Sequence, residues 1–316
     1  MVYSNSAQIE VQLESTLKKN LQGLFALSQF KEFVYYVVIT TLLGVAAARG
    51  VFDWRLPVIL AANWLTVGFS FMIRGIADAP EDAFSPNSNP PNPIALGLIT
   101  PKTAQIGAAL TALLAALLFV FLGGWALVLG LVALLTGFLY HCSSLRLRNV
   151  PVLNLILYSM MLAGWQFLCG YVIFTPRLTN RWFWPFIFVI AVTLYSEFFE
   201  EAKGLDTDST ALFQQTASVL GRRTTQVIMF ALLIIGITAG VFSLILVEII
   251  PLWVLILMFI LAAIFILSQG IFVRRPTLNW QTLELLQKPF ERAAAIALLL
   301  QYIIPWLTLT LNIKIL

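Results

Sequence analysis

The chain has 316 residues, of which 60% are hydrophobic and only 11% are charged, and its mean hydropathy is +0.90. This composition excludes a soluble domain, and its apolar stretches of about twenty residues predict an all-α polytopic membrane protein rather than a membrane barrel. The formal net charge of +4 is modest, so we interpret the basic residues as a topology signal and expect no nucleic-acid partner.

The first 32 residues differ from the rest of the chain. Across 7–27, apolar residues such as Leu13, Leu17 and Leu21 recur at steps of four, with charged residues elsewhere around the helix. This apolar stripe is too interrupted to cross a bilayer. We therefore predict an amphipathic interfacial segment at 1–32 and a single transmembrane domain at 33–316.

Nine apolar stretches follow, and each is close to the length that a helix needs to cross a bilayer. Gly123-Gly124 is the only mark of a turn between the third and the fourth stretch. A polar segment at 274–290 precedes the last stretch and is expected to carry a short interfacial helix. The predicted spans are 33–49, 56–74, 103–122, 124–141, 152–174, 182–199, 225–247, 250–272 and 291–312.

The basic residues support this count and predict an orientation. If the N-terminus and the loops after spans two, four, six and eight share one side, that side holds fourteen of the 19 Lys and Arg residues and the other side holds five. Because basic residues concentrate in cytoplasmic loops, we expect the N-terminus in the cytoplasm and the C-terminus on the opposite side. The five outer residues are Arg49, Arg55, Arg177, Arg181 and Lys314.

Two clusters of carboxylates follow the second and the sixth span, so both lie on the predicted cytoplasmic side. The first cluster contains Asp78, Glu81 and Asp82. If the helix continues past span two, Asp78 and Asp82 share one face and can approach one cation, whereas Pro80 favours a kink or a restart there. The second cluster runs from Glu197 to Asp208.

Oxygen-rich clusters with little His or Cys suit Mg²⁺, which is commonly held by one or two carboxylates and substrate phosphates. Two such clusters on either side of a cavity could hold a diphosphate through bridging metals. The alternative is that the carboxylates are solvated charges that cap helices and pair with nearby Arg and Lys side chains. Charges this close to hydrocarbon tend to be functional, which favours the first interpretation.

Three polar stretches lie between the predicted spans in a fixed order. Asp78-Ala-Pro-Glu-Asp82 is followed by a Pro- and Asn-rich stretch and by 92–100; 140–151 follows span four; and 201–208 precedes Leu220-Gly221-Arg222. In this order they resemble the motifs of the UbiA superfamily of intramembrane prenyltransferases. The resemblance covers nearly the whole chain and implies nine helices around a central cavity that opens to the bilayer.

The resemblance also implies a reaction, its cofactor and its site residues. It implies Mg²⁺-assisted ionisation of a polyprenyl diphosphate and transfer of the prenyl group to an aromatic or lipid acceptor. Catalytic roles fall on Asp78, Asp82 and Asp208. The implied metal ligands are Asp78, Glu81, Asp82, Glu201, Asp206 and Asp208, and the implied diphosphate-binding residues are Arg74, Arg146, Arg148 and Lys203.

This sequence departs from the family pattern in both acidic motifs. Arg74-Gly75 stands where the first motif usually has Asn-Asp, and Glu201 and Gly204 stand where the second usually has Asp. Arg74 either binds a phosphate directly or neutralises Asp78 and leaves an inactive site. The alternatives are therefore altered chemistry on the same fold, such as phosphosugar transfer to a polyprenyl phosphate or terpene cyclisation, and a non-catalytic lipid-binding protein or complex subunit.

Four further polar residues are candidates for the cavity. Asn63 lies in the middle of a span and either lines the cavity or bonds to a neighbouring helix. Tyr140 and Tyr195 lie beside the motifs and are candidates to line the site, although tyrosine is also ordinary at interfaces. His141, the only histidine, either contacts a phosphate or transfers a proton, or is satisfied by backbone groups, and we favour the last.

Overall fold

The structure is a computed structural model that describes residues 17–84, 91–142, 147–175, 177, 179–204, 216–268 and 280–311, without the side chains of 203, 204 and 280–284. Every regular element in these ranges is helical, which confirms the all-α prediction. The helices are one at 17–27 and α2 (Phe30–Ala47), α3 (Arg55–Asp82), α4 (Pro101–Leu122), α5 (Gly124–His141), α6 (Leu153–Ser159), α7 (Trp165–Val172), α8 (Phe183–Gly204), α9 (Thr216–Leu220), α10 (Arg222–Ile245), α11 (Leu252–Ser268) and α13 (Trp280–Thr310).

Eight of these helical segments are long and apolar enough to cross a membrane, and the protein is therefore an integral multi-pass membrane protein. α6 and α7 are joined by a π-helical segment, Met160–Gly164, and count as one span. α11 is apolar but shorter, with 17 described residues. Each of the nine stretches predicted from the sequence thus coincides with a helix.

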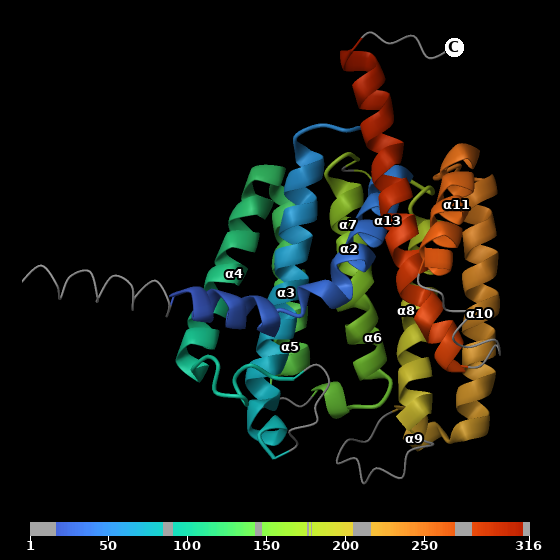
Figure 1. The fold of residues 1–316 in the computed structure, drawn as a ribbon. Coiled ribbons are helices and arrows are strands. Elements are labelled where there is room, and N and C mark those ends of the chain that lie inside the picture. The colour runs from blue at the N-terminus through green and yellow to red at the C-terminus, as the bar shows by residue number, and fades with distance from the viewer. Residues whose placement is uncertain are drawn as a thin grey trace, which may run out of the picture.

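The long helices stand roughly parallel in one bundle, with α4 at one side and α10 and α11 at the other (Figure 1). The dark blue helix at 17–27 lies across α3 and α4 in this view. Its Leu24 and Leu27 pack against these two helices, whereas Leu17, Leu21 and Phe25 are exposed. An apolar outer face of this kind suits a helix at the membrane interface, although the interfacial location stays a prediction.

Local chemistry explains two of the boundaries. The Thr100 side chain caps α4 by accepting a hydrogen bond from the Thr103 N–H at 3.1 Å, and Pro101 occupies the first helical turn. Gly123 separates α4 from α5 with a φ of 107°, a value that is costly for a residue with a Cβ. The predicted turn at Gly123-Gly124 is therefore the observed one.

Two boundaries differ from the expected ones. α3 does not stop near residue 74 but continues as one helix through Pro80 to Asp82. A proline this close to the helix end removes only one late backbone hydrogen bond, so the helix tolerates it. At the other end of the chain, the segment from 280 to 290 is the beginning of α13 rather than a separate interfacial helix. Because α3 extends to Asp82, the first carboxylate cluster lies on a helix and not in a loop.

Candidate functional site

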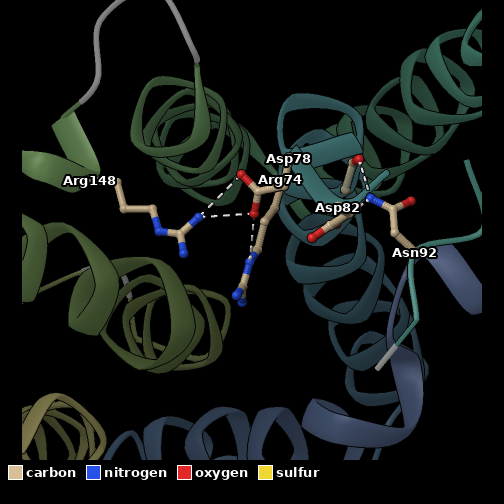
Figure 2. Close-up of polar contacts among 6 residues, drawn as sticks. Arg74, Asp78, Asp82, Asn92 and Arg148 are labelled. Carbon is tan, nitrogen blue, oxygen red and sulfur yellow. Dashed lines mark hydrogen bonds and ion pairs between the residues drawn. The ribbon is translucent and has the colours of Figure 1, made fainter. Parts of the chain in front are cut away.

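Asp78 lies between two arginines that come from different parts of the chain. Arg148, from the 3₁₀ turn Leu147–Asn149, approaches Oδ2 of Asp78 at 3.0 Å and Oδ1 at 3.3 Å through one Nη1. Arg74, one helical turn before Asp78 on α3, approaches Oδ2 through Nε at 3.4 Å. Figure 2 shows Arg148 directed at both oxygens of this carboxylate, whereas Arg74 contacts it through Nε and its terminal nitrogens point away. The side chains are about a third exposed, so their charges remain accessible to a ligand.

Asp82 lies one turn further along α3, on the same side, but has a different partner. The amide Nδ2 of Asn92 donates to Oδ2 of Asp82 and to the carbonyl oxygen of Gly75, both at 2.8 Å (Figure 2). The Asn92 Oδ1 accepts from the Ile94 N–H at 3.0 Å. This buried asparagine therefore fixes the loop after the first motif onto the end of α3.

Glu201, near the end of α8, is only 3% exposed, and both of its carboxylate oxygens accept hydrogen bonds. Asn154 of α6 donates to Oε1 at 2.7 Å, and the Ala217 N–H at the start of α9 donates to Oε2 at 2.8 Å. Thr216 extends this network by donating to Asn154 Oδ1 at 2.8 Å. In the described part of the chain, Glu201 thus joins α6, α8 and α9.

Three cavities that share lining residues lie one after another from Asp78 to the space between α2, α8 and α13. The smallest, which we call the Asp78 niche, has a volume of about 90 Å³ and is lined by Arg74, Asp78 and Asp82 among others. The polar chamber, of about 390 Å³, shares Gln29 and Arg74 with the niche. Arg74 therefore forms part of the wall between the carboxylates and a larger space.

The third cavity, the apolar chamber, measures about 570 Å³ and lies between α2, α8 and α13. Its walls are mainly aliphatic and aromatic. It shares four residues with the polar chamber, so the two spaces adjoin. The shared residues are Tyr36, Ser196, Gln287 and Glu291.

The structure brings some of the predicted site residues together and places others apart. Tyr195 lines the apolar chamber. Asn63 is buried and donates to Thr41 Oγ1 at 2.8 Å and to the Gln166 carbonyl at 3.2 Å, which is the helix-bonding alternative. Tyr140 is 3% exposed and packs beside Tyr158, which lines the polar chamber. Glu81 is exposed and does not line the niche.

Four predicted residues cannot be placed: Arg146, Asp206 and Asp208 lie outside the described residues, as does the side chain of Lys203. His141 differs from the interpretation that we favoured. It is 7% exposed, and neither ring nitrogen has a hydrogen-bond partner within the described chain. Backbone groups therefore do not satisfy it there.

Several residues that shape the site were not predicted from the sequence. Asn154 and Tyr158 come from the fifth span, and Lys288 and Glu291 come from α13. Their position within or beside an apolar span could have indicated a place in the bundle interior, because polar and charged residues there rarely face lipid. Their partners, however, are distant in sequence: Lys288 Nζ lies 3.1 Å from Glu32 Oε2.

The described carboxylates fit a Mg²⁺ ion that is shared with a substrate, but not a metal site made by protein alone. Asp78 and Asp82 present oxygen ligands to one niche, and Mg²⁺ often takes one or two carboxylates, with phosphate oxygens and water as the remaining ligands. No group of three or more His, Cys, Asp or Glu residues gathers in the described part of the chain.

Comparisons with known proteins identify a family and structures that share this fold. The family model described as the UbiA prenyltransferase family matches residues 37–285. No curated protein matches the sequence significantly. Similar solved structures include a digeranylgeranylglyceryl phosphate synthase, with 18% identity, a TM-score of 0.60 and coverage of 88% of this chain and 98% of that chain.

Two further similar structures are archaeal UbiA homologues. The Archaeoglobus fulgidus homologue, solved with GPP and Mg²⁺, is 15% identical with a TM-score of 0.62, and the match covers 89% of this chain and 96% of that chain. The Aeropyrum pernix K1 homologue, solved in the apo form, is 15% identical with a TM-score of 0.64, and the match covers 87% and 98%. At these identities the likeness establishes a shared fold.

Proposed function

The chain belongs to the UbiA prenyltransferase family, and we propose that it is an intramembrane enzyme that transfers the prenyl group of a polyprenyl diphosphate to an aromatic or lipid acceptor. The observation that carries this proposal is the series of adjoining cavities. A charged niche at the end of α3 shares wall residues with a polar chamber, and this chamber shares wall residues with an apolar space of about 570 Å³. An amphipathic substrate with an anionic head and a hydrocarbon tail matches this gradient.

The headgroup end of the site would hold the diphosphate through Arg74 and Arg148. Guanidinium groups bind phosphate oxygens through paired, charge-assisted hydrogen bonds. Asp78 orients both groups, because it already lies 3.0 Å from Arg148 and 3.4 Å from Arg74. Arg146 and Lys203, which belong to the same two motif regions, are proposed to add further positive charge.

Mg²⁺ is the proposed cofactor, held by Asp78 and Asp82 together with Asp206 and Asp208 of the second motif. A bound Mg²⁺ ion would withdraw charge from the diphosphate and make it a better leaving group. The Archaeoglobus homologue with GPP and Mg²⁺ supports this assignment. Glu201 is proposed to support the second motif from behind, since its two oxygens already hold Asn154 and the Ala217 N–H.

The polar chamber would hold the reacting carbon, because this carbon is bonded directly to the diphosphate beside Arg74, and the apolar chamber would hold the rest of the prenyl chain. When the allylic C–O bond breaks, its electron pair leaves with the diphosphate and a carbocation remains on the prenyl chain. Aromatic rings stabilise a cation through their faces, and Phe33, Tyr36 and Phe71 line the polar chamber. Excluding water from the bound complex prevents hydrolysis, so that the acceptor forms the new bond and releases a proton.

A non-catalytic role is the second candidate, and one observation favours it: Arg74 is paired with Asp78. A complex subunit without a ligand is expected to lose its cavity, because nothing would maintain the empty space, and the polar and apolar chambers are inconsistent with that role. A lipid-binding protein would keep the chambers but show no prenyl transfer in the test below. We therefore favour an enzyme in which Arg74 is a phosphate ligand.

The test is transfer of a labelled prenyl chain by the purified protein in nanodiscs with Mg²⁺, using prenyl diphosphates of several lengths and a panel of acceptors. Asp78→Asn keeps the side-chain volume and is expected to lower kcat/KM at least 100-fold, a loss typical of an electrostatic catalytic group. Glu81→Gln, on the same helix but exposed, is the matched control. Equal activity of Asp78→Asn and the wild type would contradict the proposed site.

Product mass spectrometry in the same assay separates the remaining chemistries. A prenylated acceptor supports the proposal. A phosphosugar-linked polyprenyl phosphate or a cyclised terpene would instead assign the altered chemistry considered from the sequence. Asp208→Ala extends the test to the second motif, and its activity is expected to fall with that of Asp78→Asn if the two motifs share one substrate.

A further inference from the structure

A second charged cavity, separate from the proposed prenyl-transfer site, lies at the other end of the bundle. It has a volume of about 270 Å³ and is formed by the end of α2, the residues before α8, the loop between α10 and α11, and α13. Its lining includes Arg49, Arg181, Glu248, Gln301 and Tyr302. We call this cavity the Arg49 pocket.

Helix geometry places the Arg49 pocket far from the polar chamber that adjoins the Asp78 niche. On α2, Glu32 lines the polar chamber and Ala46 lines the Arg49 pocket; on α13, Gln287 and Gln301 do the same. Both pairs are fourteen residues apart, or about 21 Å at 1.5 Å per residue. Since the hydrocarbon core of a bilayer is about 30 Å thick, this separation carries the pocket towards the phosphate layer of the opposite leaflet.

The charge of the pocket favours an anion. Two guanidinium groups face one carboxylate, and Arg49 forms no ion pair in the described part of the chain. Arg181 donates from Nε to the Ala47 carbonyl at 3.3 Å and from Nη2 to the Val247 carbonyl, which fixes its side chain at the pocket wall. Burial and the nearby Arg49 lower the pKa of Arg181, while Glu248 opposes this shift. Positive charge is therefore concentrated here beyond what the protein neutralises.

The backbone supports a specific role for Arg49 and Glu248. They are two of only four non-glycine residues with positive φ in the described chain, with values of 55° and 52°. Arg49 follows α2 in a turn where its N–H donates to the Ala46 carbonyl and the Gly50 N–H donates to the Val45 carbonyl. This is a Schellman turn, whose left-handed position is usually glycine. An arginine with this φ is sterically strained, whereas a glycine would adopt the same φ without that cost.

We propose that the Arg49 pocket binds the phosphate group of an anionic phospholipid from the leaflet opposite the Asp78 niche. Arg49 and Arg181 contact the phosphate, and Glu248 selects against headgroups with additional negative charge.

The test measures lipid binding to the purified full-length protein by native mass spectrometry and by the thermal unfolding midpoint. Phosphatidylglycerol is compared with phosphatidylcholine, and inorganic phosphate is added in a separate series. The wild type is expected to bind phosphatidylglycerol more tightly, and a ligand that binds only the folded state raises the midpoint. Arg49→Gly is expected to weaken this binding about fivefold, which corresponds to one basic residue near a membrane surface.

Three comparisons make the test specific. Arg49→Gly relieves the strained φ, so the lipid-free midpoint is expected to rise while lipid affinity falls, a combination that general destabilisation does not produce. Glu248→Gln is expected to tighten phosphatidylglycerol binding. Arg177→Gln, an exposed arginine of the loop before α8 that does not line the pocket, is expected to leave binding unchanged.

The two phosphate sources give different results. A response to phosphatidylglycerol that inorganic phosphate does not reproduce supports the lipid assignment. Arg49-dependent stabilisation by inorganic phosphate alone would replace the lipid with a soluble phosphate and overturn it. Equal lipid affinity of Arg49→Gly and the wild type, or weaker binding by Glu248→Gln, would overturn the proposal as well.

Discussion

At the scale of single residues, the acidic side chains near the candidate site fall into two groups: some are accessible to a ligand and others stabilise the fold. Asp78 lies in a niche beside two cations that a ligand can reach, whereas Glu201 is buried and holds a side-chain amide and a backbone N–H. A buried carboxylate with these partners stabilises the fold, since removing it leaves buried donors unsatisfied. Replacing Asp78 is therefore expected to lower activity, whereas replacing Glu201 is expected to lower stability.

Glu201→Ala is expected to destabilise the protein, because Asn154 Nδ2 and the Ala217 N–H lose their acceptor. Each unsatisfied buried donor costs about 1–3 kcal/mol. Glu201→Gln keeps one acceptor oxygen and the side-chain volume, so it is expected to lose less. Thermal unfolding in detergent measures both variants beside Asp78→Ala, whose midpoint is expected to stay near that of the wild type. A Glu201→Ala protein as stable as the wild type would contradict this structural role.

At the scale of helices, the close contact of α2 with α7 holds the bundle together beside the cavities. A Cβ on Gly44 would lie 2.1 Å from the Phe167 carbonyl oxygen, and one on Gly170 would lie 2.5 Å from the Thr41 carbonyl oxygen. Both obstacles are backbone atoms, so a side chain can be added only if the helices move apart. Small residues let membrane helices approach this closely and gain packing energy.

Gly44→Ala is therefore expected to destabilise the bundle by about 1–3 kcal/mol, the usual cost of overpacking. Gly68→Ala is the matched control, because its nearest neighbour lies 3.6 Å from the added Cβ, an ordinary contact. The yield of folded protein and its unfolding midpoint measure the difference. If both variants unfold at the same temperature, the backbones of α2 and α7 are farther apart than in this structure.

Helix positions follow from hydropathy, but their ends and partners do not. The nine apolar stretches predicted the helices, and the spacing of Asp78 and Asp82 predicted a shared face. Hydropathy, however, marks only the length of a helix that lies within the hydrocarbon core, so it missed the extension of α3 to Asp82. It also missed Arg148 and Asn92 as partners of the two carboxylates, because these contacts depend on how distant segments pack.

At the scale of the whole molecule, the two ends of the bundle are chemically distinct. The described carboxylates of the two clusters lie at the ends of α3 and α8, the lower end in Figure 1, whereas the Arg49 pocket lies beyond the C-terminal end of α2, at the opposite end of the bundle. The proposed prenyl-transfer site at one face and the proposed lipid-phosphate site at the other would require a fixed orientation in the membrane. The distribution of basic residues predicts that the Asp78 end faces the cytoplasm.

Single-cysteine labelling tests this orientation. The two native cysteines are free, so a Cys142→Ser, Cys169→Ala background provides an unlabelled protein. Phe84→Cys and Val51→Cys then place exposed thiols just beyond the two ends of α3, whose 28 residues span about 42 Å. In right-side-out vesicles, a membrane-impermeant maleimide is expected to label Val51→Cys at once and Phe84→Cys only after permeabilisation. The reverse order would invert the predicted topology and move the proposed diphosphate site to the outer face.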